Sequence, residues 1–448
     1  MQRPLIAVLI SSALLTFNAQ AADLLQVYQQ ALANDATYAS ARAALAAGQE
    51  KINEGRAGLL PTVLATGSNT RNTGNETASS GSSITGVPGS PTVVPIGVDN
   101  NYHLNAYTVS LSQPLFDWVH WEQYQQSKLL SANAEATFAQ AQEDLITRVA
   151  QAYFDVLTAE DNLTSTQAQK VATTEQLASA KRNFEVGTQT ITDTHEAQAA
   201  YDLVVAQEFA AINDLDNKRA ALQAIIGTPP AELAPLRTGV VITAPVPAAI
   251  DAWVESAENK NYAVVSAQLG LEIAKRQIGL DRAGHMPSAS FVASNSHTNQ
   301  TGYGVINNNA VGVQWSIPIF SGFGVTSKVR ESIALEDKAR NDLEATRRAA
   351  SLNARQAFLG MNSGLAQVKA LEAAEVSSKS SLDSNKLGYQ VGVRINIDVL
   401  NAQKLLYSTQ KDLAKARYDT IMNGLRLKSA AGTLKEEDLG PINALLTH

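Results

Sequence analysis

The chain of 448 residues contains no cysteine, and only 6% of its residues are aromatic. The missing cysteine excludes disulfides, thiolate-bound metals and a lipid-modified N-terminal cysteine. Alanine dominates the apolar residues, which favours close contact between helices over a thick core of large side chains. A protein of this length without disulfides must therefore be stabilised by packing or by assembly.

The chain also lacks a surplus of positive charge and any long apolar run beyond its first residues. Its formal net charge of −7 argues against a nucleic-acid partner. No later segment approaches the about 20 apolar residues of a spanning helix, so we expect no inner-membrane helix. The histidines show no zinc-like spacing, and no nucleophile elbow, phosphate loop or dinucleotide fingerprint occurs. We therefore expect no enzyme, no cofactor and no metal site.

The N-terminus has the pattern of a secretory signal peptide. Arg3 supplies positive charge, residues 4–15 are mostly apolar, and Ala19-Gln20-Ala21 forms a small-x-small cleavage site. A membrane anchor is the alternative, but the apolar stretch is short for a spanning helix. We predict that residues 1–21 are a signal peptide and that the chain is exported.

Two long stretches without proline predict long helices. Proline breaks helices, and both stretches are rich in the helix-forming residues Ala, Gln, Leu, Glu and Lys. Each is interrupted once by a Val-Gly pair, at Gly187 and at Gly392, because glycine tolerates the left-handed backbone of a turn. We predict two antiparallel helical hairpins, over residues 127–226 and 326–431.

Ahead of each helical hairpin, apolar and polar residues alternate, as they do over residues 311–319. Period-two alternation predicts strands with one apolar and one polar face. Together with weaker strand patterns upstream, these segments predict β-hairpins over residues 61–115 and 286–320. The Gly-, Ser- and Asn-rich segment at 72–101 predicts a polar, flexible tip for the first of them.

The same plan occurs twice along the chain. Val186-Gly187, Asp193 and Ala197-Gln198 recur in the same order as Val391-Gly392, Asp398 and Ala402-Gln403. Matches of this kind extend over most of the chain, which indicates a duplicated architecture. We predict a first repeat at 22–227, which opens with a short helix at 23–56, and a second repeat at 249–432, which opens with a short helix at 249–282. A Pro-rich connector at 228–248 joins the two repeats, and a C-terminal tail follows at 433–448.

Four strands are too few to close a barrel in a membrane. Spanning barrels begin at about eight strands, and an open sheet in lipid would leave its edges unpaired. Three copies would together supply about twelve strands and an open lumen. The alternative is a soluble domain whose sheet is covered by its own helices.

Several segments resemble the TolC family of outer-membrane efflux and secretion channels. They are Gly388-Tyr389-Gln390-Val391-Gly392-Val393-Arg394, Ile397-Asp398-Val399-Leu400-Asn401-Ala402 and the mature start at 23–31. The similarity covers nearly all of the mature chain and excludes the lipid-anchored branch, which has an N-terminal cysteine. The resemblance implies a mixed α/β membrane channel. Three chains would form a twelve-stranded transmembrane β-barrel, four strands from each, continued by a long α-helical barrel in the periplasm.

The resemblance also implies a function. Such a homotrimer is a passive exit duct in the outer-membrane lipid, opened like an iris at its periplasmic end. It docks a periplasmic adaptor and an ABC or proton-driven inner-membrane transporter, and it conducts small toxic molecules or unfolded proteins. Two rival hypotheses are a periplasmic adaptor protein and an exported hydrolase with a helical shell.

The family's pore and gate residues can be carried over by position. Asp398 matches the aspartate that constricts the pore, and a ring of three such carboxylates favours cations. One family member has a second aspartate ring one turn further on, where this chain has Asn401.

The resemblance implies a latch between the two helical hairpins as well. Arg394 matches an arginine that ties the hairpins together, and Thr192 and Asp193 match its acceptors. Tyr389 matches a tyrosine that hydrogen-bonds the same aspartate. A further link joins a glutamine, here Gln176, to a glutamate that Lys386 replaces, so we expect that contact to be changed or lost.

Overall fold

The computed structural model describes residues 21–79, 95–99, 101–302 and 304–447. Apart from Ala21, the predicted signal peptide lies outside the described residues. The chain divides into two compact units. The helical unit takes the described residues of 1–45, 135–267 and 343–448, and the sheet unit takes those of 46–134 and 268–342. Each unit contains segments from both sequence repeats, so the units are not the repeats.

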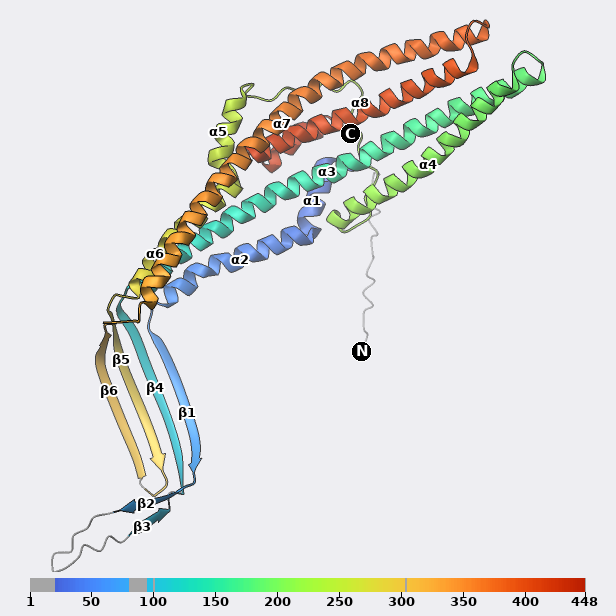
Figure 1. Ribbon diagram of the computed structural model, residues 1–448. Coiled ribbons are helices and arrows are strands. Elements are labelled where there is room, and N and C mark those ends of the chain that lie inside the picture. The colour runs from blue at the N-terminus through green and yellow to red at the C-terminus, as the bar shows by residue number, and fades with distance from the viewer. Residues whose placement is uncertain (1–20, 80–94, 100, 303, 448) are drawn as a thin grey trace, which may run out of the picture. The chain divides into compact units, whose positions relative to one another are not determined.

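The described parts of both halves share the order of two short helices, two paired strand segments and two long helices, and the first half has an additional pair of short strands (Figure 1). The first half contains, in order, α1 (Leu24–Asn34), α2 (Ala36–Ala57), β1 (Thr62–Asn72), β2 (Asn75–Ser79), β3 (Pro95–Asp99), β4 (Tyr102–Asp117), α3 (Trp118–Glu185) and α4 (Ile191–Ile226). The second contains α5 (Ile250–Lys260), α6 (Tyr262–Ala283), β5 (Ser288–Gln300), β6 (Gly304–Ser316), α7 (Gly324–Gln390) and α8 (Asn396–Ala430), followed by a 3-10 turn (Glu436–Asp438) and α9 (Leu439–Asn443).

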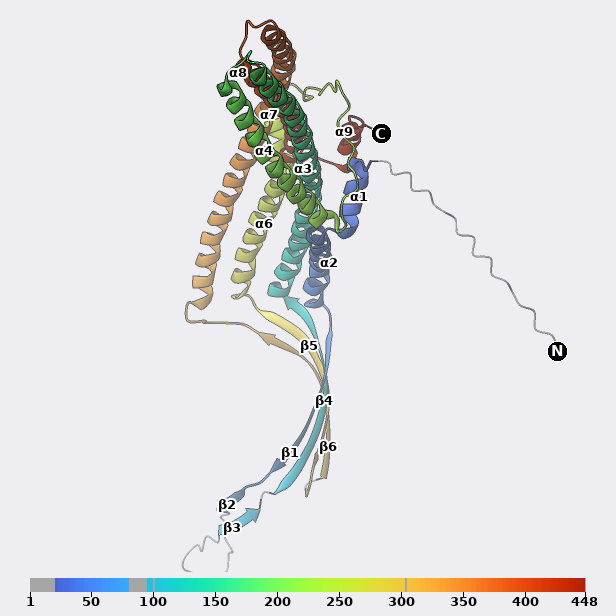
Figure 2. The same ribbon diagram turned by 90° about the vertical axis from the view of Figure 1, so that its right-hand side faces the viewer.

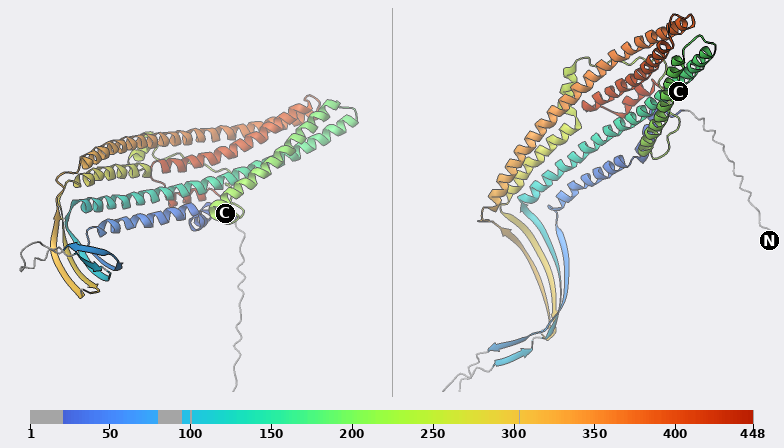
Figure 3. Two further views of the ribbon diagram at one scale, coloured as in Figure 1. Left: turned by 60° about the horizontal axis from the view of Figure 1, so that its bottom comes forward. Right: turned by 45° about the vertical axis from the view of Figure 1, so that its right-hand side comes forward.

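The sheet unit is built on four antiparallel strands in the order β1-β4-β5-β6, which both views of Figure 3 show. The two predicted β-hairpins therefore lie side by side, joined through β4 and β5. The tip predicted as a flexible connection at 72–101 differs from expectation, because β2 and β3 pair there as a separate two-stranded ribbon.

Both edge strands of the four-stranded sheet are open. Every residue of β1 and of β6 is exposed, whereas exposure alternates along most of β4. The exposed side chains include large apolar ones, with Val63 67% exposed, Val311 73% and Trp315 70%. In the part of the chain that the structure describes, no strand pairs with the outer edge of β1 or of β6.

The chain contains two similar Ser-x-Pro-x-Phe segments, at 112–116 and 316–320, and the structure places them differently. The first lies inside β4, where the pairing with β5 shifts its register between Pro114 and Phe116. The second falls outside the sheet, since β6 ends at Ser316, earlier than the predicted boundary at 320. A proline cannot donate a backbone hydrogen bond, so it is accommodated at a bulge or just beyond a strand end.

The long helical hairpins are α3 with α4 and α7 with α8, and Figure 2 shows both pairs in the helical unit. The helix α3 is 68 residues long and begins at Trp118, ahead of the predicted start at 127. Each predicted short helix is in fact two helices. Asp35 and Asn261 interrupt them, because their side chains accept hydrogen bonds from the backbone amides of Tyr38 (2.6 Å) and Ala263 (3.0 Å) and so cap a new helix.

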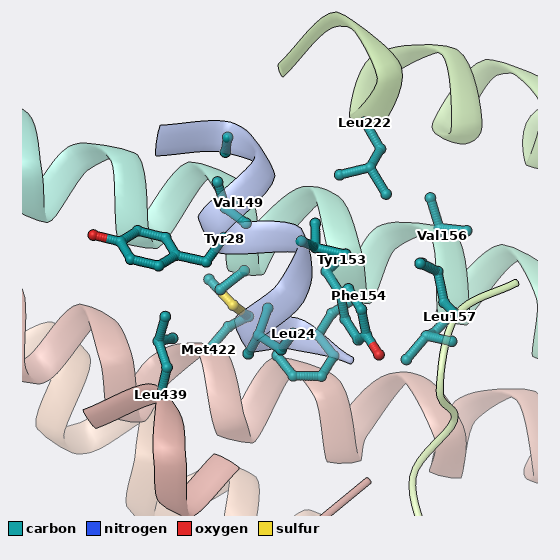
Figure 4. Close-up of a cluster of buried hydrophobic side chains, with 14 of the residues drawn as sticks. Leu24, Tyr28, Val149, Tyr153, Phe154, Val156, Leu157, Leu222, Met422 and Leu439 are labelled. Carbon is teal, nitrogen blue, oxygen red and sulfur yellow. The ribbon is translucent and has the colours of Figure 1, made fainter. Parts of the chain in front are cut away.

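The core of the helical unit lies where α1, α3, α8 and α9 meet (Figure 4). The hydroxyl of Tyr153 is fully buried and donates to the carbonyl oxygens of Ala234 (2.8 Å) and Ala22 (3.2 Å). These bonds hold the connector against the segment that precedes α1. The C-terminal tail also packs into this core, because Leu439 and Leu446 are completely buried.

None of the helices in the described ranges combines the length and the apolar character that a membrane crossing requires.

Candidate functional site

The turns of the two helical hairpins lie next to each other at one end of the helical unit (Figure 1). Gly187 and Gly392 adopt left-handed backbone conformations, with φ of 75° and 78°. In the second turn the amides of Val393 and Arg394 both donate to the carbonyl of Gly388 (2.9 and 3.1 Å). Both glycines were predicted from the sequence as turn positions, and the backbone explains why L side chains are disfavoured there.

The second helices of the two hairpins begin differently. Thr190 caps α4, and Asp193 completes a capping box, because its carboxylate accepts from the Thr190 amide (3.1 Å) and hydroxyl (2.9 Å). The equivalent cap position of α8 is Ile395, whose side chain makes no capping bond. The carboxylate of Asp193 is therefore engaged inside its own helix terminus.

A buried asparagine joins the two hairpins. Asn396 is 0% exposed, and its Oδ1 accepts from Nε2 of Gln176 on α3 at 2.6 Å. Its Nδ2 donates to the backbone carbonyl of Asp193 on α4 at 3.0 Å. The first turn of α8 is thus bound to both helices of the other hairpin by one amide group.

Tyr389 makes a second bridge. Its hydroxyl donates to Oε1 of Gln189 at 2.8 Å and accepts from Nδ2 of Asn183 at 3.3 Å. Tyr389 therefore bonds the first hairpin through Gln189 and Asn183, whereas the resemblance implied a bond to Asp193. Every side chain in the two bridges is uncharged. We call the Asn396 and Tyr389 bridges together the joint between the hairpins, and this joint contains no ion pair among the described residues.

The charged residues predicted for the latch lie outside this joint. The Arg394 guanidinium is 3.7 Å from the carboxylate of Asp398, one turn along the same chain segment, and the pair is largely exposed. Within one chain, Arg394 is not tied to Thr192 or Asp193. Thr192, Lys386 and Asn401 are exposed. Gln176 bonds Asn396 instead of a residue at position 386.

The sequence interpretation missed Asn396. Its counterpart in the first repeat is Ile191, which is 46% exposed, so the polar residue is buried and the apolar one is exposed. A polar residue at a position where the other repeat has an apolar one was the available signal. Among the described residues no group of His, Asp and Glu side chains is arranged to hold a metal ion.

The family model described as "Outer membrane efflux protein" matches residues 27–228 and 253–433. The chain belongs to this family of outer-membrane channels. Membership confirms the predicted family and outer-membrane location, and it confirms the expectation that the protein is not an enzyme.

Individual relatives are similar over almost the whole chain. The sequence is 32% identical to outer membrane protein TolC of Vibrio cholerae over 99% of this chain and 98% of that protein. It is 33% identical to outer membrane protein TolC of Escherichia coli, covering 99% of this chain and 90% of that protein. It is 30% identical to alkaline protease secretion protein AprF of Pseudomonas aeruginosa over 95% of this chain and 88% of that protein.

Solved structures share the fold at lower sequence identity. The outer-membrane channel OprN has a TM-score of 0.77 at 18% identity, with 92% of this chain and 90% of that chain covered. The open state of the Neisseria gonorrhoeae MtrE outer membrane channel has a TM-score of 0.73 at 20% identity, with the same coverage. The mixed α/β channel fold predicted from the sequence is therefore confirmed.

Proposed function

We propose that three copies of this chain form the outer-membrane exit duct of a tripartite export machine. The observation that carries the proposal is the four-stranded sheet with two unpaired edges, β1 and β6. Unpaired backbone groups at a sheet edge cost several kcal/mol each in lipid, so the edges need partners. If β1 of one copy pairs with β6 of the next, three copies give about twelve strands around an open lumen.

Exposed side chains support the same arrangement. Val63, Val311 and Val313 are each more than half exposed, and the strand register places them on one face of the sheet. Contiguous exposed apolar surface marks a contact with lipid or protein. A closed barrel in the outer membrane supplies that contact on the outer faces of the strands.

The periplasmic end of the duct is closed, in this proposal, by the paired hairpin tips. The Asn396 and Tyr389 bridges hold the second hairpin of each chain against the first, and opening separates them as an iris does. Asp398 and Asn401 line the constriction, with three carboxylates as the cation-selective ring. Since Arg394 does not reach its own Thr192 and Asp193, its latch partners are those residues of a neighbouring copy.

The names of the relatives support the proposed partners and cargo. AprF and PrtF are named for the secretion of proteases, and BepC for efflux. A duct of this kind needs a periplasmic adaptor and an inner-membrane transporter as its energy source, and it conducts unfolded proteins or small toxic molecules.

The test combines size and conductance. The mature chain purified in mild detergent should have the mass of three copies and should give discrete single-channel currents in planar bilayers. A monomer that fractionates with the soluble periplasm would overturn the proposal and favour the adaptor hypothesis. A trimer without conductance would leave assembly standing and refute the duct.

A further inference from the structure

A recess with mixed polar and apolar lining lies between the two helical hairpins. Its volume is about 340 Å³, and it is enclosed by α3, α4 and α8. From α8 it is lined by Asn401, Lys404, Ser408 and Lys411, whose spacing of three and four residues puts them on one helix face. The volume is in the range of small-molecule sites.

Lys411 is a half-buried cation whose ammonium has no salt-bridge partner in the described part of the chain. Its ammonium donates to the hydroxyl of Thr166 at 2.8 Å and forms no salt bridge there. Burial lowers the pKa of this ammonium below its ordinary value, while the nearby Asp412 carboxylate opposes the shift. Lys415, one turn further on, differs because it pairs with Asp419 at 2.6 Å.

Gln403 adds an unsatisfied acceptor to the same recess. Its side chain is only 3% exposed, and its Oε1 has no hydrogen-bond partner among the described residues. Its counterpart in the first repeat, Gln198, is satisfied by Asp202 and Lys181. A buried acceptor without a partner destabilises the folded chain, so a ligand that supplies a donor would remove that penalty.

The recess therefore carries a net positive charge and lacks a hydrogen-bond donor for Gln403 Oε1. Lys404 and Lys411 face a single acid, Glu196, across the lining. We propose that this recess binds a small oxyanion that carries its own hydrogen-bond donor, of which hydrogen phosphate is the simplest. The lysine ammoniums balance the negative charge, and the ligand O–H donates to Gln403 Oε1. Sulfate has the same shape but no proton to donate, so the site distinguishes the two ions.

The test is equilibrium binding to the purified full-length protein in detergent, followed by calorimetry with sodium phosphate and sodium sulfate at neutral pH. We expect phosphate to bind more tightly than sulfate. Lys411→Met should weaken phosphate binding about tenfold or more, because a charge-assisted bond is lost. Lys415→Met removes the same charge one turn away and should leave binding unchanged. Gln403→Leu should abolish the preference for phosphate over sulfate.

If Lys411→Met and Lys415→Met weakened phosphate binding equally, the proposed site would be overturned, because the loss would then come from the change in net charge and not from the recess. Absence of phosphate binding to the wild-type protein would overturn it too. Lys404→Met, at an exposed position, provides a second variant that does not disturb packing, and it should also weaken phosphate binding. The measurement needs no open channel, so its outcome is independent of the conductance test of the duct.

Discussion

Asn396 and Ile191 occupy equivalent positions in the two repeats, yet their environments are opposite. Asn396 is completely buried and satisfied at both amide atoms, whereas Ile191 is 46% exposed. A buried amide is stable only when its hydrogen bonds are made, so Asn396 requires Gln176 and the Asp193 carbonyl in place. The joint between the hairpins is neutral, and we expect its strength to depend little on salt.

Replacing Asn396 with leucine should favour the open state. Two hydrogen bonds are lost, and the partner groups are left unpaired, at about 0.5–1.5 kcal/mol for each bond. The open fraction should therefore rise by about tenfold in single-channel recordings. Asn385→Leu is the matched control, because Asn385 bonds only Ser381 within its own helix. Identical recordings from both variants would refute the role of Asn396.

Replacing Asp398 with alanine should reduce the preference for cations. The constriction would lose three carboxylates, while Asn401 supplies only neutral groups. The reversal potential in a potassium chloride gradient should move toward zero. Asp383→Ala removes an exposed charge on α7 and serves as the control. An unaltered reversal potential in the Asp398 variant would exclude this residue from the constriction.

At the scale of elements, a buried carboxylate joins α3 to the segment after α8. Glu143 is 5% exposed and accepts from the backbone amide of Leu434 (3.2 Å) and the hydroxyl of Ser429 (3.3 Å). Burial raises the pKa of Glu143 to about 7, although both hydrogen bonds oppose this. The charged form is therefore disfavoured in the folded chain relative to the unfolded one.

The raised pKa makes the folded chain less stable as the pH rises. Below pH 4.5, the ordinary pKa of a glutamate carboxyl, Glu143 is protonated in both states and its burial does not disfavour folding. As the pH rises from there to about 7, the unfolded state releases the proton first, and folding loses up to about 3 kcal/mol. Glu143→Gln should remove this loss, raising the unfolding midpoint at pH 8 and leaving it unchanged at pH 4. Equal midpoint differences at both pH values would contradict the prediction.

At the scale of the whole molecule, one chain leaves two kinds of contact incomplete. The edges of β1 and β6 are open in the described residues, and Arg394 contacts Asp398 instead of the first hairpin. Both are satisfied if neighbouring copies complete them. Assembly then seals the sheet and closes the hairpin tips at the same time.

Cysteine cross-linking can separate contacts within a chain from contacts between copies, because the natural sequence has no cysteine. Arg394→Cys combined with Thr192→Cys should yield species of two and three chains on a denaturing gel after mild oxidation. Tyr389→Cys combined with Gln189→Cys is the control, and it should cross-link within one chain. Monomeric products from the first pair would refute the latch between copies.

The sequence could predict those features that depend on local rules. Missing proline marked the helical hairpins, period-two alternation marked the strands, and the Val-Gly pairs marked turns that need positive φ. Local rules also explain the errors. Asp35 and Asn261 restart helices through side-chain caps, and the tip of the first β-hairpin pairs as β2 and β3, although its composition indicated a loop.

The sequence alone determined the duplicated plan, the export class and the absence of disulfides, because periodicity and composition are readable without contacts. Only the tertiary structure decided which polar groups meet at the hairpin tips. Hydrogen-bond partners there are about 200 residues apart in sequence, as Tyr389 and Gln189 are, and no local pattern encodes such a pairing. The tertiary structure likewise decided the burial of Asn396 and of Gln403, whose Oε1 has no partner among the described residues. Burial depends on how helices far apart in the sequence pack together.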